Sequence, residues 1–206
     1  MVRRHLAARD ITDRRVLAAM ASIPRACFVP PHLRDQAYAD TPLPIGYDQT
    51  ISQPYIVALM TQEARINRHS LVLDVGTGTG YQTAILAKIA RHVWSMERLA
   101  ALSREAEWRL ASLGIRNATL IIGDGALGHP EAAPFDAIIV SAASPKPPRP
   151  LLEQLAVGGR LVIPIGDRVL QDLTIVERTD TGHRQHTAGP CRFVPLLSVE
   201  AFAEYD

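Results

Sequence analysis

Three alternating glycines behind an acidic residue form the part of the sequence best suited to binding a ligand. In the segment Leu71–Gly80, a short run rich in apolar residues is followed by Asp74, Gly76, Gly78 and Gly80. Glycines let the backbone turn tightly and approach a ligand with no Cβ in the way. The helix expected after them points its free N–H groups at the same place. The segment therefore predicts a strand, a turn and a helix around a cofactor site.

The spacing of these glycines narrows the kind of cofactor. The dinucleotide fingerprint requires Gly-x-Gly-x-x-Gly, whereas this chain has Gly-x-Gly-x-Gly, with Tyr81 where the third fingerprint glycine would stand. This departure argues against NAD or FAD. With Asp74 two residues ahead of the first glycine, the pattern resembles the first motif of Rossmann-like methyltransferases that depend on S-adenosylmethionine (SAM).

Two further acidic residues follow the next strands. Glu97 ends the expected strand 92–96, about 20 residues beyond the glycines, where Rossmann-type sites bind ribose hydroxyls with a carboxylate. Asp124 and Gly125 follow the expected strand 118–122, on the edge of the sheet where ligands bind, so Asp124 is a candidate for the adenine edge. Alone, Glu97 could be a solvated surface acid and Asp124 part of a plain turn.

A polar cluster, Gln49–Gln53, lies between two apolar stretches ahead of the glycines. Pro54 suits the first position of a helix, so Ser52 or Gln53 could simply cap that helix. An ordinary connecting loop needs less hydrogen-bonding capacity than this cluster offers. A role in ligand binding is therefore an equally good interpretation of Ser52.

The bulk composition predicts a single domain, residues 1–206. The 206 residues are 47% hydrophobic, and 22 basic and 21 acidic residues give a formal net charge of +1. We therefore expect neither nucleic acid nor a membrane as a partner.

Cys27 and Cys191 show no zinc spacing, and His183 and His186 are too isolated to suggest a metal site. No signal peptide and no apolar run of about 20 residues occurs, so we expect a cytoplasmic protein.

Hydrophobic periodicity predicts the elements that hold these residues. We expect an amphipathic helix over 10–20, capped by Asp10 and followed by a proline-rich stretch. Both belong to an N-terminal segment, residues 1–60, which we expect to contribute to the cofactor cover and the substrate site. Strands are expected at 71–75, 92–96, 118–122, 135–140 and 160–165, and helices from 54, over 81–90, 99–113 and 151–155.

The alternation of strands and helices predicts an α/β fold of the Rossmann-like class. Its central sheet should be mostly parallel, with helices on both faces. Two strand-like runs, 170–178 and 192–199, suggest an antiparallel C-terminal strand pair. Ser141 and Ala142 follow the strand 135–140, and small residues there would leave room for a substrate beside the reactive end of the cofactor.

Several segments, taken together and in order, match one family over almost the whole chain. The chain resembles the protein-L-isoaspartate O-methyltransferases, which repair isomerised aspartate and deamidated asparagine. Gln49–Ser52, with the later Phe-Val-Pro-Leu segment, distinguishes this family from other SAM-dependent methyltransferases. The matching segments are Phe28–Pro30, Leu43–Gly46, Gln49–Tyr55, Asp74–Gly80, Gly123–Gly125, Ala133–Asp136, Gly158–Val162 and Phe193–Leu196.

The resemblance implies transfer of the SAM methyl group to the free α-carboxylate of an L-isoaspartyl residue, with S-adenosylhomocysteine (SAH) as product. It implies that Ser52 is the catalytic residue, that Gln49–Ser52 covers the cofactor, and that isoaspartyl proteins are the substrates. We also expect the protein to be a monomer. The implied cofactor-binding residues are Gln49, Thr50, Ile51, Asp74, Gly76, Thr77, Gly78, Gly80, Glu97, Asp124 and Gly125. The implied substrate-binding residues are Ser52, Ser141, Ala142, Val194, Pro195 and Leu196.

One departure from the family pattern keeps two alternatives open. Asp48 stands where relatives often have a glycine just before Gln49, and an acid there could repel an acidic peptide or stiffen the loop. A SAM-dependent methyltransferase acting on another carboxylate or a small molecule is therefore one alternative. A SAM-binding module without catalysis is the other, although an intact Ser52 beside complete cofactor motifs argues against it.

Overall fold

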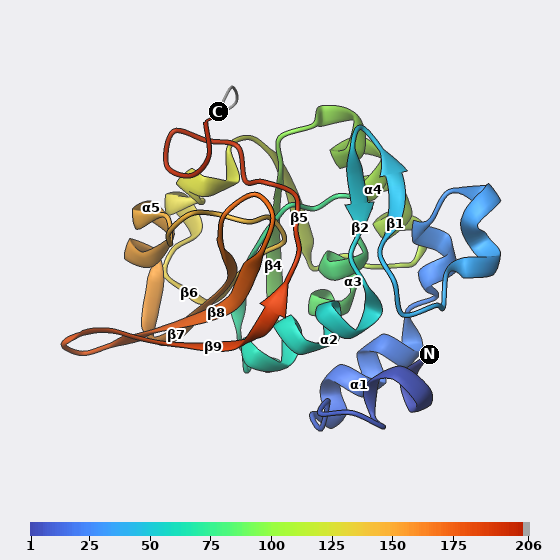
Figure 1. Ribbon diagram of the computed structural model, residues 1–206, viewed down its shortest axis with the longest axis horizontal. Coiled ribbons are helices and arrows are strands. Elements are labelled where there is room, and N and C mark those ends of the chain that lie inside the picture. Colours follow the sequence, from blue (N-terminus) through green and yellow to red (C-terminus); the bar gives the residue numbers. More distant parts are fainter. Residues whose placement is uncertain (204–206) are drawn as a thin grey trace.

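A seven-stranded sheet forms the centre of the computed structural model, which describes residues 1–203 (Figure 1). Its spatial order is β5-β4-β3-β6-β7-β8-β9. Pairing is parallel from β5 through β7 and antiparallel from β7 to β9. The α/β class and the antiparallel C-terminal pair are thus confirmed. The strands are β3 (Leu71–Val75), β4 (His92–Glu97), β5 (Ala118–Ile122), β6 (Phe135–Val140), β7 (Leu155–Gly166), β8 (Gln171–Thr179) and β9 (Gly182–Cys191).

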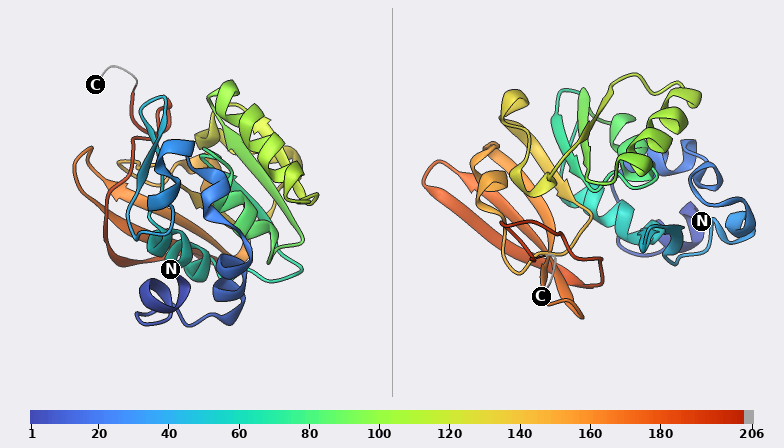
Figure 2. Two further views of the ribbon diagram at one scale, coloured as in Figure 1. Left: turned by 90° about the vertical axis from the view of Figure 1, so that its right-hand side faces the viewer. Right: turned by 90° about the horizontal axis from the view of Figure 1, so that it is seen from above.

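Helices cover both faces of this sheet, because side chains alternate between two cores along the central strands. Val72 packs on one face with residues of α1, α2 and α3, whereas Leu73 packs on the other with Leu151 of α5. The N-terminal helices and the C-terminal strands lie at opposite ends of the molecule (Figure 2). The α-helices are α1 (Arg14–Ser22), α2 (Pro54–Glu63), α3 (Tyr81–Ala87), α4 (Ala100–Ser112) and α5 (Arg149–Glu153).

Short helical turns fill the connections. A π-helical turn, η1 (Val2–Leu6), precedes α1, and the 3₁₀ turns η2 (Arg25–Phe28) and η3 (Pro31–Gln36) follow it. Two more 3₁₀ turns, η4 (Gly125–Leu127) and η5 (Pro130–Ala132), connect β5 to β6. None of the helices within residues 1–203 is long and apolar enough to cross a membrane.

A two-stranded hairpin, β1 (Leu43–Gly46) and β2 (Gln49–Ile51), was not expected from the sequence. Pro44 lies within β1 and argues against a strand, but a two-stranded ribbon leaves one edge of each strand unpaired, where a missing N–H is tolerated. Tyr47 and Asp48 form the turn with φ values of 54° and 56°. Both central residues are therefore left-handed, as a tight hairpin turn requires.

Three expected boundaries were wrong. The last strand of the sheet is 182–191, not 192–199, because the turn after Thr179 is tight and β9 is an edge strand whose outward residues are polar. The strand expected at 160–165 begins at Leu155, so Gly158 and Gly159 lie within β7. The first helix begins at Arg14, because Asp13 rather than Asp10 accepts the capping hydrogen bond from the Arg15 N–H.

Candidate functional site

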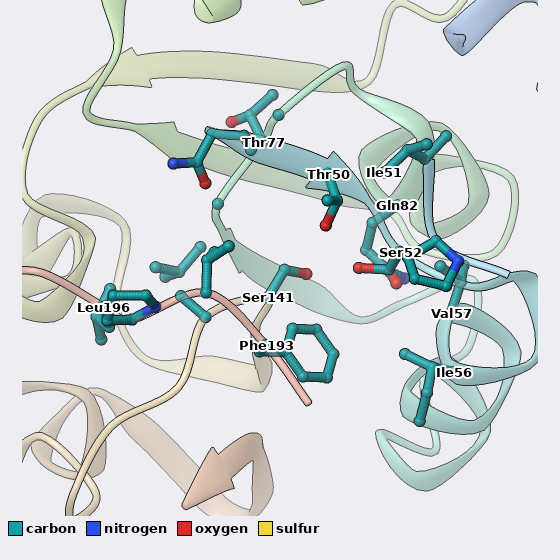
Figure 3. A pocket seen from close by; sticks show the side chains of 18 of the residues that line it. Thr50, Ile51, Ser52, Ile56, Val57, Thr77, Gln82, Ser141, Phe193 and Leu196 are labelled. Carbon is teal, nitrogen blue, oxygen red and sulfur yellow. The ribbon is translucent and has the colours of Figure 1, made fainter. Parts of the chain in front are cut away.

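A cavity of about 1040 Å³ opens at the carboxyl ends of the parallel strands β3 to β6. In doubly wound sheets the crevice at this edge is the usual ligand site. The hairpin and the start of α2 form one side, and the segment after β9 forms the other. Figure 3 shows Ser52 and Gln82 at one end and Leu196 at the other, with Ser141 and Phe193 between.

The glycine turn between β3 and α3 supplies the floor of this cavity. The N–H groups of Gly76 and Thr77 donate to the carbonyl of Met96 at 2.9 and 3.2 Å, which fixes the turn against the end of β4. Gly76, Thr77 and Gly78 line the cavity, whereas Gly80 lies behind it. A Cβ at Gly80 would lie 3.3 Å from the Cβ of Ala106, so this glycine lets α3 approach α4.

Asp74 lies beneath the turn and does not reach the cavity wall, because its side chain is fully buried. One carboxylate oxygen accepts hydrogen bonds from the hydroxyls of Thr83 (2.6 Å) and Ser95 (2.9 Å). The other oxygen has no partner within the described residues. Burial, with a smaller contribution from the nearby Glu97, raises the pKa of Asp74 to about 6. Any effect of Asp74 on a ligand therefore passes through the turn.

The raised pKa of Asp74 predicts a loss of stability as the pH rises. At a pH below the pKa of Asp74 in the unfolded chain, near 3.8, Asp74 is protonated in both the folded and the unfolded state. It then adds no pH dependence to the free energy of unfolding. Between about pH 4 and pH 6 only the folded state retains the proton, so unfolding becomes easier, by on the order of 1 kcal/mol per pH unit. Asp74→Asn should remove this slope from the free energy of unfolding, measured by urea denaturation across the window.

Asp180→Asn is the matched control for this prediction, because Asp180 is exposed in the turn between β8 and β9. The control variant should retain the wild-type slope. Identical pH profiles for wild type and Asp74→Asn would contradict the assignment of the slope to Asp74.

Glu97 connects the glycine turn to the next helix. Its side chain is nearly buried, with Oε2 accepting from the Gly78 N–H at 2.9 Å and Oε1 accepting from the Leu99 N–H at 3.0 Å. A carboxylate has about four acceptor positions, so each oxygen can take one more hydrogen bond. Because Glu97 also lines the cavity, its spare acceptor positions are open to the donors of a ligand.

Asp124 is both a turn residue and part of the cavity wall. Its Oδ1 caps η4 by accepting from the Ala126 N–H at 2.9 Å, and its Oδ2 accepts from the Ser198 hydroxyl at 2.7 Å. The following Gly125 has no room for a side chain, since a Cβ there would lie 2.3 Å from Val75. The two interpretations of Asp124 are therefore compatible.

Ser52 lies between β2 and α2 and lines the cavity. The N-cap position belongs to Gln53, and the Tyr55 N–H of the first helical turn donates to Asp40 at 3.0 Å. Gln53 also donates to Asp40, at 2.9 Å. Within residues 1–203 the Ser52 hydroxyl has no hydrogen-bond partner, because Asp40 performs the capping that this serine could have supplied. The hydroxyl is therefore available to a ligand.

The remaining candidate residues line the opposite side. Ser141 and Ala142 extend from β6, and Val194 to Leu196 run beside them. The Ala143 N–H donates to the Val194 carbonyl at 2.8 Å, and the Leu196 N–H donates to the Ala143 carbonyl at 2.7 Å. Residues expected to form a strand thus form a wall of the cavity, bonded to the end of β6.

Some residues at the cavity had no signal in the sequence. Four arginines from distant parts of the chain line its wall: Arg9, Arg98, Arg168 and Arg192. The Arg9 guanidinium lies 3.3 Å from the centre of the Tyr55 ring and 3.4 Å from Asp40. Proximity of such distant positions follows only from the fold. Among the lining residues, all within the described chain, there is no histidine.

Comparison with known proteins gives one consistent match. A family model described as Protein-L-isoaspartate(D-aspartate) O-methyltransferase (PCMT) matches residues 1–201. A relative from Synechococcus sp. (strain JA-2-3B'a(2-13)), named protein-L-isoaspartate O-methyltransferase, is 53% identical over 204 residues, covering 96% of this chain and 84% of the relative.

Two solved structures share the fold. One, named protein-L-isoaspartate O-methyltransferase, has a TM-score of 0.83 and 27% identity; the match covers 93% of this chain but only 63% of that longer one. The other, from Plasmodium falciparum, is described as a protein-L-isoaspartate O-methyltransferase in complex with S-adenosyl-L-homocysteine. It has a TM-score of 0.80 and 26% identity, covering 95% of this chain and 96% of that chain.

Proposed function

Because the chain belongs to the protein-L-isoaspartate(D-aspartate) O-methyltransferase family, we propose that it methylates the free α-carboxylate of L-isoaspartyl residues in damaged proteins and peptides, with SAM as donor and SAH as product. The methyl ester can then close to a succinimide, which starts repair. One observation supports this role most directly: the Ser52 hydroxyl has no structural partner within residues 1–203 and lies in the same cavity as the glycine turn and Glu97.

The lining residues fit this cofactor. Glu97 has spare acceptor positions for the two ribose hydroxyls, Asp124 and Gly125 stand at the next strand end for the adenine, and Gly76 to Gly78 keep the floor free of bulky side chains. Gln49 to Ile51 form the cover on the hairpin side. When bound, SAM supplies an electrophilic methyl group on a sulfonium.

The residues of this chain then have mainly to position the substrate. An α-carboxylate is already ionised near neutral pH, so no general base is needed, which agrees with the absence of histidine from the described lining. We assign to Ser52 a hydrogen bond from its hydroxyl to the substrate carboxylate, which orients the attacking oxygen without a covalent intermediate. Val194 to Leu196 hold the substrate main chain, and the small Ser141 and Ala142 leave it room.

A direct test uses labelled SAM with two peptides that differ only in containing isoaspartate or ordinary aspartate. Label transferred to the isoaspartyl peptide alone, in a base-labile ester, is the expected result. Transfer to neither peptide would overturn the proposed function. Transfer to a carboxylate in both peptides would favour the broader methyltransferase alternative.

Asp48 is the residue that favours a narrower or different substrate range, because it lies at the hairpin turn and lines the cavity. Asn tolerates the left-handed conformation at this position, so Asp48→Asn removes the charge and preserves the turn. We expect KM for isoaspartyl peptides with acidic neighbours to fall about two- to fivefold, with kcat unchanged. The change should shrink as salt is added, since exposed charges are screened.

The control for Asp48→Asn is an isoaspartyl peptide with neutral neighbours, for which KM should stay constant. An equal change of KM on both peptides would assign Asp48 a role in the shape of the turn instead of charge selection.

A cytoplasmic location and a monomeric state stay predictions.

A further inference from the structure

Arg25, at the start of η2, is fully buried and donates to three main-chain carbonyls. Its Nη1 donates to Ala37, and its Nη2 donates to Thr41 at 3.3 Å and to Ser52 at 3.0 Å. No carboxylate forms an ion pair with it within the described residues, and its Nε has no partner there. Burial lowers the pKa of Arg25, although Tyr81 and Asp40 oppose that shift. Burying a cation without an ion pair is energetically costly, so its placement calls for an explanation.

The position of the three acceptors indicates what Arg25 holds. Thr41 lies just before β1 and Ser52 directly after β2, so a single nitrogen joins the two ends of the hairpin 43–51. Through its hydrogen bond to the Ala37 carbonyl, at the end of η3, Arg25 also binds the segment that precedes the hairpin. Because β1 and β2 form a separate sheet, no strand pairing joins the hairpin to the central sheet, and apart from its two ends it is held by the packing of Leu43, Ile45 and Ile51 on the core.

Arg25 also lies next to the cofactor side of the cavity. Its guanidinium carbon is 5.7 Å from the centre of the ring of Tyr81, which is the first residue of α3 after the glycine turn. Tyr81 in turn contacts Phe28, at the other end of η2, with ring centroids 5.4 Å apart. One buried side chain therefore touches both the segment that carries Ser52 and the helix that follows the glycine turn.

We propose that Arg25 is a positioning residue for methyl transfer: by clamping both ends of the hairpin, it fixes where the Ser52 hydroxyl stands relative to the cofactor turn. The inference rests on the proposed function for its catalytic part only. Ser52 is held by its main-chain carbonyl, which leaves its hydroxyl available to the substrate. Misplacing a reacting group by about 1 Å can cost about 100-fold in rate, so a clamp on this segment has a measurable effect.

Arg25→Lys is the informative variant, because lysine retains the charge but lacks the planar fork that reaches several carbonyls at once. We expect kcat on the isoaspartyl peptide to fall about 10- to 100-fold per folded molecule, while Kd for SAH changes less than about threefold. Arg160→Lys is the matched control. Arg160 is also buried and donates to a carbonyl, that of Glu63, and to Glu177, away from the hairpin. Its variant should lose stability but retain kcat.

Two further measurements separate positioning from folding. In Arg25→Ala, added guanidinium ion, at concentrations far below those that denature proteins, should restore part of kcat in a saturable way, whereas equal concentrations of sodium chloride or urea should not. Hydrogen exchange should show faster exchange of the hairpin amides in Arg25→Lys and wild-type rates in Arg160→Lys. If Arg25→Ala does not fold, the lysine variant and its exchange rates carry the test.

Unchanged kcat per folded Arg25→Lys molecule, or equal losses of kcat and SAH affinity, would overturn the positioning role. Unchanged exchange of the hairpin amides would overturn the clamp itself. If wild type does not methylate the isoaspartyl peptide, the proposed function fails, and the exchange comparison still decides whether Arg25 clamps the hairpin.

Discussion

Ser52→Ala is expected to lower kcat for isoaspartyl methylation by about 100-fold, while Kd for SAH stays within about twofold. The hydroxyl is the group that we assign to the substrate carboxylate, and a hydrogen bond to a charged group contributes about 1.5–3 kcal/mol. The loss should appear in the chemical step because orientation of the attacking oxygen is what the bond supplies. Single-turnover kinetics with labelled SAM, together with calorimetry of SAH binding, measure the two quantities separately.

The structure makes this prediction sharper than the sequence could. Because Gln53 occupies the N-cap position and Asp40 accepts the Tyr55 N–H, removing the Ser52 hydroxyl should leave the melting temperature almost unchanged. Ser112→Ala is a suitable control, since that exposed serine only donates to the Arg109 carbonyl on α4. A fall in stability and in SAH affinity as large as the fall in kcat would make Ser52 a structural residue.

The positions of the central strands along the chain could be predicted because each short apolar run is bounded by glycine, proline or an acid. Leu71 to Val75 and Phe135 to Val140 read as buried strands, and the structure pairs them as parallel neighbours. Positions at the ends of such strands can be predicted too, since parallel strands place their carboxyl ends on one edge. This is why Glu97 and Asp124 lie in the same cavity although 27 residues apart.

Other features depend on contacts that local sequence does not record. The hairpin 43–51 closes through a turn with two left-handed residues, Tyr47 and Asp48. Neither is the glycine or asparagine that is typical of such a turn, so the sequence did not predict it. The run 192–199 was expected to be a strand of the sheet, yet Val194 and Leu196 bond to Ala143 at the end of β6 and Phe193 bonds to Gln171, so this segment forms a cavity wall. Arg25 gave no signal, because its partners are main-chain carbonyls, which every residue has.

Asp74 and Gly80 show the limit of motif reasoning at the site. Both belong to the glycine motif, but neither lines the cavity. Asp74 accepts hydrogen bonds from the buried hydroxyls of Thr83 and Ser95, and Gly80 leaves space for the close approach of α4. A motif therefore marks residues that build the turn as well as residues that face the ligand, and only packing separates the two groups.

Glu97→Ala is expected to weaken SAH binding by about 100-fold, or about 3 kcal/mol. Two effects act in the same direction. The variant loses the acceptor that we assign to the ribose hydroxyls, and it also releases the N–H groups of Gly78 and Leu99, which hold the glycine turn and the start of α4. Glu105→Ala, on the exposed side of α4, is the control and should leave Kd for SAH unchanged.

The two effects can be separated with an SAH analogue that lacks both ribose hydroxyls. If Glu97 accepts from those hydroxyls, wild type should bind the analogue much more weakly than SAH, whereas Glu97→Ala should bind the two ligands about equally. The coupling between residue and hydroxyls is then the difference of the two losses. If the variant still discriminates between the ligands as strongly as wild type, Glu97 acts only by holding Gly78 and Leu99, and another group must recognise the ribose.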